Sequence, residues 1–64
     1  MKNIVQDFVA EGIIGQYNIP WHILRLRDIK NNSECYDLYI DHEHIKTCDS
    51  VKEALKVLID QFEE

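Results

Sequence analysis

Residues 48–55 read Cys48-Asp49-Ser50-Val51-Lys52-Glu53-Ala54-Leu55, and this stretch carries the clearest structural signal of the chain. Ser50 followed three residues later by Glu53 forms a capping box, in which the side chains satisfy backbone N–H groups of the first helical turn. Apolar residues then recur at the spacing of one helical face, at Val51, Leu55, Leu58 and Phe62. The pattern predicts a C-terminal helix.

The N-terminal segment shows a weaker pattern of the same kind. Asn3 followed by Gln6 resembles a second helix start. The apolar residues that would share one helical face are Ile4, Val5, Phe8 and Val9. Gly12 suits a helix end, so a first helix is expected from about Ile4 to about Ile13.

Between these helices the apolar pattern changes to a period of two, which indicates strands over 21–29, 35–41 and 45–48. Pairing Leu26 with Leu38 would turn Leu24, Leu26 and Leu38 inward. A register shifted by two residues would keep the same faces. The residues then expected on the outward face are Trp21, Ile23, Arg25, Arg27 and Tyr39.

The expected architecture is therefore a single α+β domain over residues 1–64, in the order α-β-β-β-α. A three-stranded antiparallel meander would carry both helices on one face. This order, with the run Ser50-Val51-Lys52-Glu53-Ala54, resembles the double-stranded-RNA-binding domain in topology. The resemblance implies duplex RNA as a ligand, but the motifs that bind it are missing. Lys52 and Lys56 form no basic cluster, and the loop at 31–33 lacks glycine, proline and histidine.

Composition and charge argue against some classes of function. The chain has 64 residues and a net charge of −5, and all of the excess negative charge falls in residues 35–64. This distribution argues against binding to a phosphate backbone. No signal peptide or membrane span is recognisable, and two cysteines are too few for a disulfide framework, so a cytoplasmic protein with reduced thiols is expected.

Catalytic, cofactor and metal sites are not expected. The densest group of potential ligands is His42-Glu43-His44 with Cys48, but its spacing matches no established zinc site. Ser50 is explained as a helix cap, and no cysteine lies in surroundings that would activate a thiolate.

The remaining hypothesis is a small non-enzymatic module that binds another protein as an adaptor, regulator or inhibitor. The expected contact residues are Trp21, Ile23, Arg25, Arg27 and Tyr39, because aromatic residues and arginine are enriched in interface hot spots. A homodimer, through the same face or through an exposed edge strand, is a variant of this hypothesis. The alternatives are a sheet face whose rings and Arg stems cover one another without a partner, a degenerate nucleic-acid-binding domain, and an acidic nucleic-acid mimic that blocks a nucleic-acid-binding protein.

Overall fold

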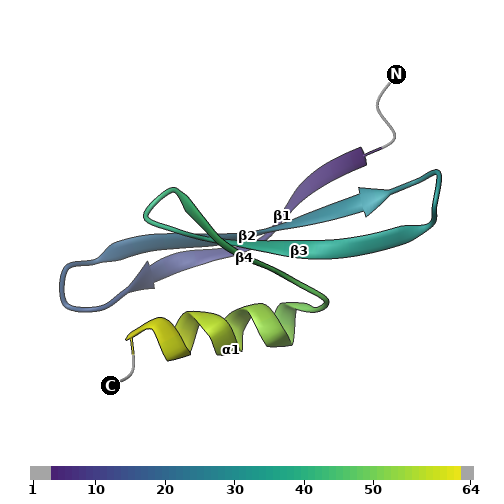
Figure 1. The fold of residues 1–64 in the computed structure, drawn as a ribbon. Coiled ribbons are helices and arrows are strands. Elements are labelled where there is room, and N and C mark those ends of the chain that lie inside the picture. Colours follow the sequence, from purple (N-terminus) through teal and green to yellow (C-terminus); the bar gives the residue numbers. More distant parts are fainter. Residues whose placement is uncertain (1–3, 63–64) are drawn as a thin grey trace.

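A computed structural model describes residues 4–62 of the chain. They form one antiparallel sheet in the order β1-β2-β3-β4, followed by a single helix (Figure 1). The elements are β1 (Ile4–Ile14), β2 (Ile19–Asp28), β3 (Ser33–Ile40), β4 (Glu43–Cys48) and α1 (Val51–Phe62). The class is therefore α+β, as expected, but the architecture differs from the expected one.

Residues 4–14 form an edge strand, so the prediction of a first helix and of three strands was wrong. A register shift between Phe8 and Ala10 marks a β-bulge at this point of β1. A bulge moves the two-residue alternation by one position, and apolar residues on either side of it then fall at helix-like intervals. The many β-branched residues of the segment favour a strand. Asn3, the proposed helix start, lies outside the described residues.

The resemblance to the double-stranded-RNA-binding domain ends with this correction. That topology begins with a helix, whereas this chain begins its described part with the longest strand of a four-stranded meander. One helix, not two, lies against the sheet (Figure 1). Neither the α-β-β-β-α order nor the two-helix layer is present in residues 4–62.

The C-terminal helix is confirmed, including its first turn. The backbone N–H of Glu53 donates a hydrogen bond to Oγ of Ser50 at 3.1 Å, as the capping box predicts. The helix contacts β3 and β4. Its buried side chains are Ala54 and Leu58, which differ from the predicted stripe because Leu55 is exposed.

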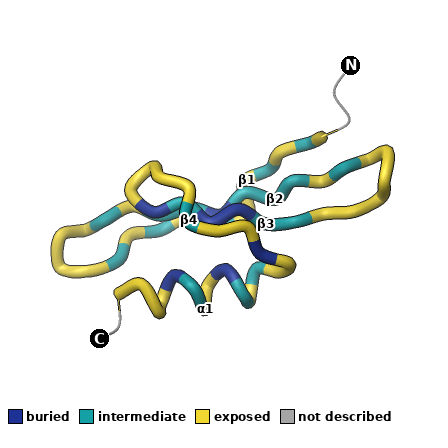
Figure 2. Tube along the Cα trace, in the orientation of Figure 1, coloured by how far each residue is buried: buried dark blue, intermediate teal, exposed yellow. Residues whose placement is uncertain are grey.

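The core lies in one layer between α1 and one face of the sheet, which we call the helix face (Figure 2). Its buried apolar residues are Ile23, Leu38, Ile40, Cys48, Ala54 and Leu58. Ile23 lies directly opposite Leu38 on the neighbouring strand, so both side chains point to α1. Because side chains alternate along a strand, the residues between them point to the other side of the sheet, which we call the open face.

Three tight turns hold the meander in register. Each contains a non-glycine residue with a positive φ angle: Asn18, Asn32, and the pair Asp41 and His42. Two successive positive φ angles, 54° and 68°, are the geometry of a two-residue type I′ hairpin. This turn matches the right-handed twist of the paired strands, so β4 returns directly alongside β3.

The molecule is elongated, with principal extents of 41 × 18 × 15 Å. Its radius of gyration is 12.6 Å, whereas a compact domain of this length would have about 11 Å. The long β1–β2 hairpin causes the difference, since α1 lies under only part of the sheet (Figures 1 and 2). A large area of sheet is therefore left without a covering layer.

Candidate functional site

The five residues expected to form one outward face lie on two different faces. Trp21, Ile23, Arg25 and Arg27 alternate onto the helix face, whereas Tyr39 lies on the open face. The strand pairing explains the error. Leu38 lies opposite Ile23 and not opposite Leu26. The register of β2 therefore differs from the expected one by three residues. A shift by an odd number of residues turns every side chain of the strand to the other side of the sheet.

Ile23 and Trp21 belong to the packed interior of the helix face. Ile23 is 0% exposed and Trp21 packs half-buried against the core. The Trp21 ring also covers Gly12 of β1, where an added Cβ would lie 2.9 Å from the ring carbon Cζ2. This close approach accounts for a glycine inside a strand. A partner therefore cannot reach Ile23 while the domain stays folded.

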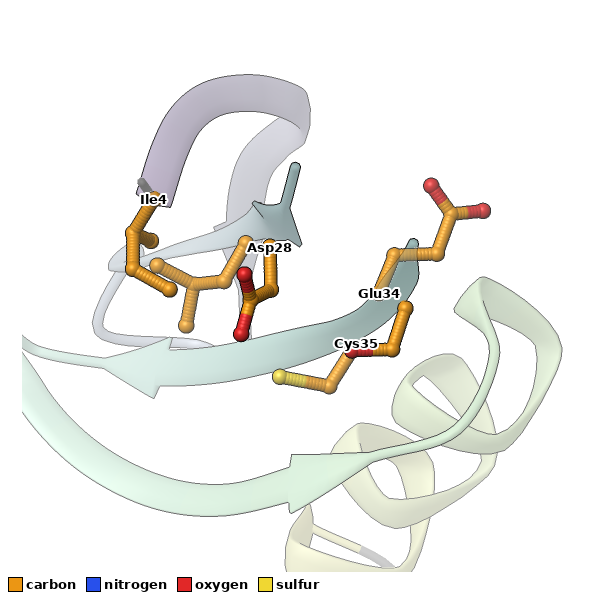
Figure 3. Close-up of a pocket in the computed structure, with 6 residues that line it drawn as sticks. Ile4, Asp28, Glu34 and Cys35 are labelled. Carbon is orange, nitrogen blue, oxygen red and sulfur yellow. The ribbon is translucent and has the colours of Figure 1, made fainter. Parts of the chain in front are cut away.

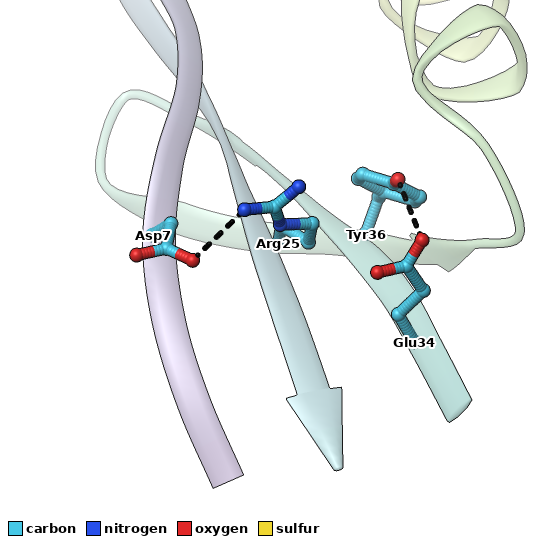
Figure 4. Close-up of polar contacts among 4 residues, drawn as sticks. All are labelled: Asp7, Arg25, Glu34 and Tyr36. Carbon is cyan, nitrogen blue, oxygen red and sulfur yellow. Dashed lines mark hydrogen bonds and ion pairs between the residues drawn. The ribbon is translucent and has the colours of Figure 1, made fainter. Parts of the chain in front are cut away.

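Arg25 is held within the sheet by a neighbouring strand (Figure 4). Its guanidinium donates a hydrogen bond to Oδ2 of Asp7 at 3.1 Å, and this bond raises the pKa of Arg25. Arg25 lies opposite Tyr36, on the other side of the sheet from Tyr39, so the alternative in which these two side chains cover one another is wrong. Arg27 is exposed at the far end of β2, on the same side of the sheet.

The open face carries a row of four rings, one from each strand. We call Phe8, His22, Tyr39 and His44 the ring row. The ring centroids of Phe8 and His22 are 5.5 Å apart, those of His22 and Tyr39 4.7 Å, and those of Tyr39 and His44 5.3 Å. His22 and Tyr39 stack at an interplanar angle of 8°. These separations lie in the range of favourable aromatic pairs.

The β4 end of the ring row is fixed by a polar cluster. Oγ1 of Thr47 donates a hydrogen bond to Oδ1 of Asp37 at 2.6 Å, and Nε2 of His44 lies 3.3 Å from the same carboxylate oxygen. Asp37 is buried, so these contacts supply the partners that a buried carboxylate needs. They hold the His44 ring at the edge of Tyr39.

The charge of the open face is one-sided. The strands of the described chain contain three Lys or Arg residues, Arg25, Arg27 and Lys46, and alternation places all three on the helix face. Glu11, Asp28 and Asp37 lie on the open face. In the described residues the rings therefore have apolar and acidic neighbours on this face and no Lys or Arg side chain.

A shallow hollow of about 280 Å³ lies at the end of the open face (Figure 3). It is formed where β1, β2 and β3 run side by side, and its lining residues are Ile4, Leu26, Asp28, Ser33, Glu34 and Cys35. Apolar side chains thus continue from the ring row to this end of the sheet.

The candidate metal ligands do not come together. Cys48 is 1% exposed on the helix face, whereas His44 lies on the open face. Within residues 4–62, no three or more His, Cys, Asp or Glu side chains form a cluster able to hold a metal ion. Glu63 and Glu64, two of the carboxylates behind the nucleic-acid-mimic alternative, lie outside the described residues.

Both thiols are free, and their surroundings disfavour the thiolate. Burial raises the pKa of Cys35 and of Cys48, and nearby carboxylates, Asp37 and Asp49 among them, raise both further. The structure thus adds a reason for the low thiol reactivity that the sequence predicted.

We expect the free energy of unfolding to fall as the pH rises above about 9, the ordinary pKa of a free thiol. In this range the unfolded chain loses its thiol protons while the folded chain keeps them, so the folded state binds more protons and stability decreases with pH. Urea titrations at several alkaline pH values would measure the slope. The control is a Cys35→Ala/Cys48→Ala variant, which should show a flatter slope; equal slopes would contradict the prediction.

Three of the four rings were missed by the sequence analysis. Phe8 was assigned to a helix, and His22 and His44 were not assigned to any face. The useful signal was the alternation itself. It places His22, Leu24 and Leu26 on one side of β2, and Asp37 and Tyr39 on one side of β3. Whether these two sides belong to the same face of the sheet depends on the strand register, which the alternation does not supply.

The chain matches no family model, and neither the curated proteins nor the solved structures contain a match to it. Within the described part, the one helix is too short and too polar to cross a membrane.

Proposed function

We propose that this chain is a small non-enzymatic module that binds another protein through the open face, as an adaptor, regulator or inhibitor. The observation that carries the proposal is the ring row on a sheet face that α1 does not cover. Phe8 is 70% exposed at one end of the row, and His44 is exposed at the other. Contiguous apolar and aromatic surface of this kind is typical of interaction sites.

The ring row has the rigidity that binding requires. Three ring pairs and the Asp37–Thr47–His44 contacts fix the side chains before a partner arrives. Side chains that are already ordered lose little rotamer entropy on binding. A row of rings that crosses all four strands of a sheet also offers a broad surface, which suits a protein better than a small molecule.

The charge of the open face favours a protein partner over nucleic acid. Stacked rings on a sheet can bind unpaired bases, but such surfaces also need cations along the backbone path. Here the three Lys or Arg residues of the strands point to the opposite side of the sheet. A partner surface with apolar groups and some Lys or Arg near Glu11 and Asp28 is the complement of this face.

Photo-crosslinking tests the proposal directly. A benzophenone amino acid is placed at position 44, at the exposed end of the ring row, or at position 56, which is exposed on α1. In lysate of the source cells we expect a protein adduct from position 44 and none from position 56. A further His22→Ala change should remove most of the adduct, because it breaks the stacked pair beneath the contact surface.

Two outcomes would contradict the proposal. Adducts of equal yield from both positions would mean that the open face has no special role. An adduct to nucleic acid at position 44 would favour the degenerate nucleic-acid-binding domain instead. Circular dichroism of each variant shows whether it is folded, so that loss of the adduct is not confused with unfolding.

A further inference from the structure

The outer edge of β1 is the longest unpaired edge of the sheet. β1 spans the 11 residues Ile4–Ile14 and pairs with β2 on one side only. The backbone groups that point away from β2 therefore have no strand partner in residues 4–62. Such an edge is a template for a further strand unless the chain protects it.

The two edges of the sheet differ in protection. The edge at β4 has 6 residues, contains Lys46, is interrupted by a register shift, and leads directly into α1. These are common devices against edge-to-edge pairing. β1 has a register shift as well, after Phe8, but its 11 residues contain no lysine, arginine or proline.

The side chains of β1 are unusually apolar for an exposed edge. Four large ones are exposed along its length: Ile4, Phe8, Val9 and Ile13. Phe8 ends the ring row because no strand lies beyond β1, whereas His22 and Tyr39 are each flanked by rings on both sides. A strand added at this edge would cover part of these side chains.

The chain exposes more surface than a compact domain of its mass. About 4,300 Å² is expected and the chain exposes 4980 Å², in keeping with its elongated shape. This shape leaves the long edge strand open to a partner chain. Small domains with little core also gain stability from association.

We propose that the occupant is a second copy of this chain, with β1 paired antiparallel to β1 of its partner. A two-fold axis perpendicular to the sheet makes such an edge self-complementary. The product is a continuous eight-stranded sheet with both helices on one side and both open faces on the other. The two ring rows then approach each other through Phe8 of each copy, and the open surface doubles.

The charges of β1 set the salt dependence of the dimer. Asp7 is already paired with Arg25, so Glu11 is the remaining charged residue that β1 brings to the interface. Each copy carries a net charge of −5, and the two copies repel one another. Salt screens this repulsion, so the dimer dissociation constant should fall as salt is added.

The proposal is tested by sedimentation velocity and light scattering over a range of concentrations. Wild type should approach twice the monomer mass of 7.6 kDa at the high end of the range. Ile13→Lys places a charge on β1 and should weaken dimerisation by about tenfold or more. The matched control is Ile29→Lys in the β2–β3 turn, since Ile13 and Ile29 are 66% and 63% exposed and the chemical change is the same.

Hydrogen exchange of the wild-type chain locates the interface without any substitution. Amides of residues 4–14 should become more protected as the concentration rises, and those of β4 should not. A monomer at millimolar concentration, equal weakening by the two lysine variants, or protection at β4 would each overturn the proposal.

The inference and the proposed function can fail separately. The proposed dimer contact lies at the edge of β1, whereas crosslinking at position 44 reports on β4, at the opposite edge of the sheet. A chain that dimerises through β1 but gives no adduct at position 44 would refute the binding function alone. A monomer that gives a specific adduct there would refute the dimer alone.

Discussion

Replacing Ile23 with alanine is expected to lower the free energy of unfolding by about 3 kcal/mol. Ile23 is 0% exposed and lies beside Leu38 in the core cluster under α1. The substitution removes buried methyl groups and leaves a cavity in the core. A domain of this length has a total stability of about 3–10 kcal/mol, so the substitution should remove about a third of that stability or more.

Urea titration followed by Trp21 fluorescence and far-ultraviolet circular dichroism measures this loss. Trp21 is the only tryptophan and packs against the same core, so its emission reports on the helix face. The matched control is Leu24→Ala, one residue further along β2 and half-buried on the open face. Leu24→Ala should cost about 1 kcal/mol, because part of the side chain already contacts water.

The pair of variants distinguishes the two possible faces of β2. If Leu24→Ala destabilised the domain more than Ile23→Ala, then Leu24 would face the core, as the sequence analysis expected. The strand register described here would in that case be wrong by an odd number of residues.

Leu58→Asp is expected to separate α1 from the sheet and to cost more than about 4 kcal/mol. Leu58 is 3% exposed and lies in the core with Ile23 and Leu38. A carboxylate at this position would be buried with no cationic partner among the core side chains. The chain can avoid that burial only by moving the helix away, and the apolar helix face would then be open to water.

Leu55→Asp on the same helix is the control, because Leu55 is 36% exposed although the sequence pattern placed it on the same face as Leu58. It should cost less than about 1 kcal/mol. Hydrogen exchange would show loss of protection throughout α1 in Leu58→Asp and retained protection in Leu55→Asp. Equal effects of the two changes would mean that α1 packs through a different stripe.

The error over residues 4–14 has a clear physical origin. A bulge adds one residue to β1 between Phe8 and Ala10. The two-residue alternation of apolar side chains is therefore interrupted at this point. The resulting intervals resemble those of an amphipathic helix. The β-branched residues of the segment were the better guide, because they favour strands through packing on a pleated surface.

The error over Trp21, Ile23, Arg25 and Arg27 has a different origin. Alternation in β2 and β3 was recognised correctly, and it separates each strand into two sets of side chains. Both sets of β2 contain large apolar residues, so composition does not decide which one faces the core. That decision depends on the turn at Asn31-Asn32, whose length places Ile23 opposite Leu38.

The sequence by itself determined the local features of this protein: the capped helix at Val51–Phe62, the three strands that precede it, and their order along the chain. These features arise from hydrogen bonds and side-chain periodicity within a few residues. The tertiary structure alone decided that residues 4–14 join the sheet and which side of β2 is buried. Both outcomes depend on contacts between distant residues, and the position of the ring row follows from them.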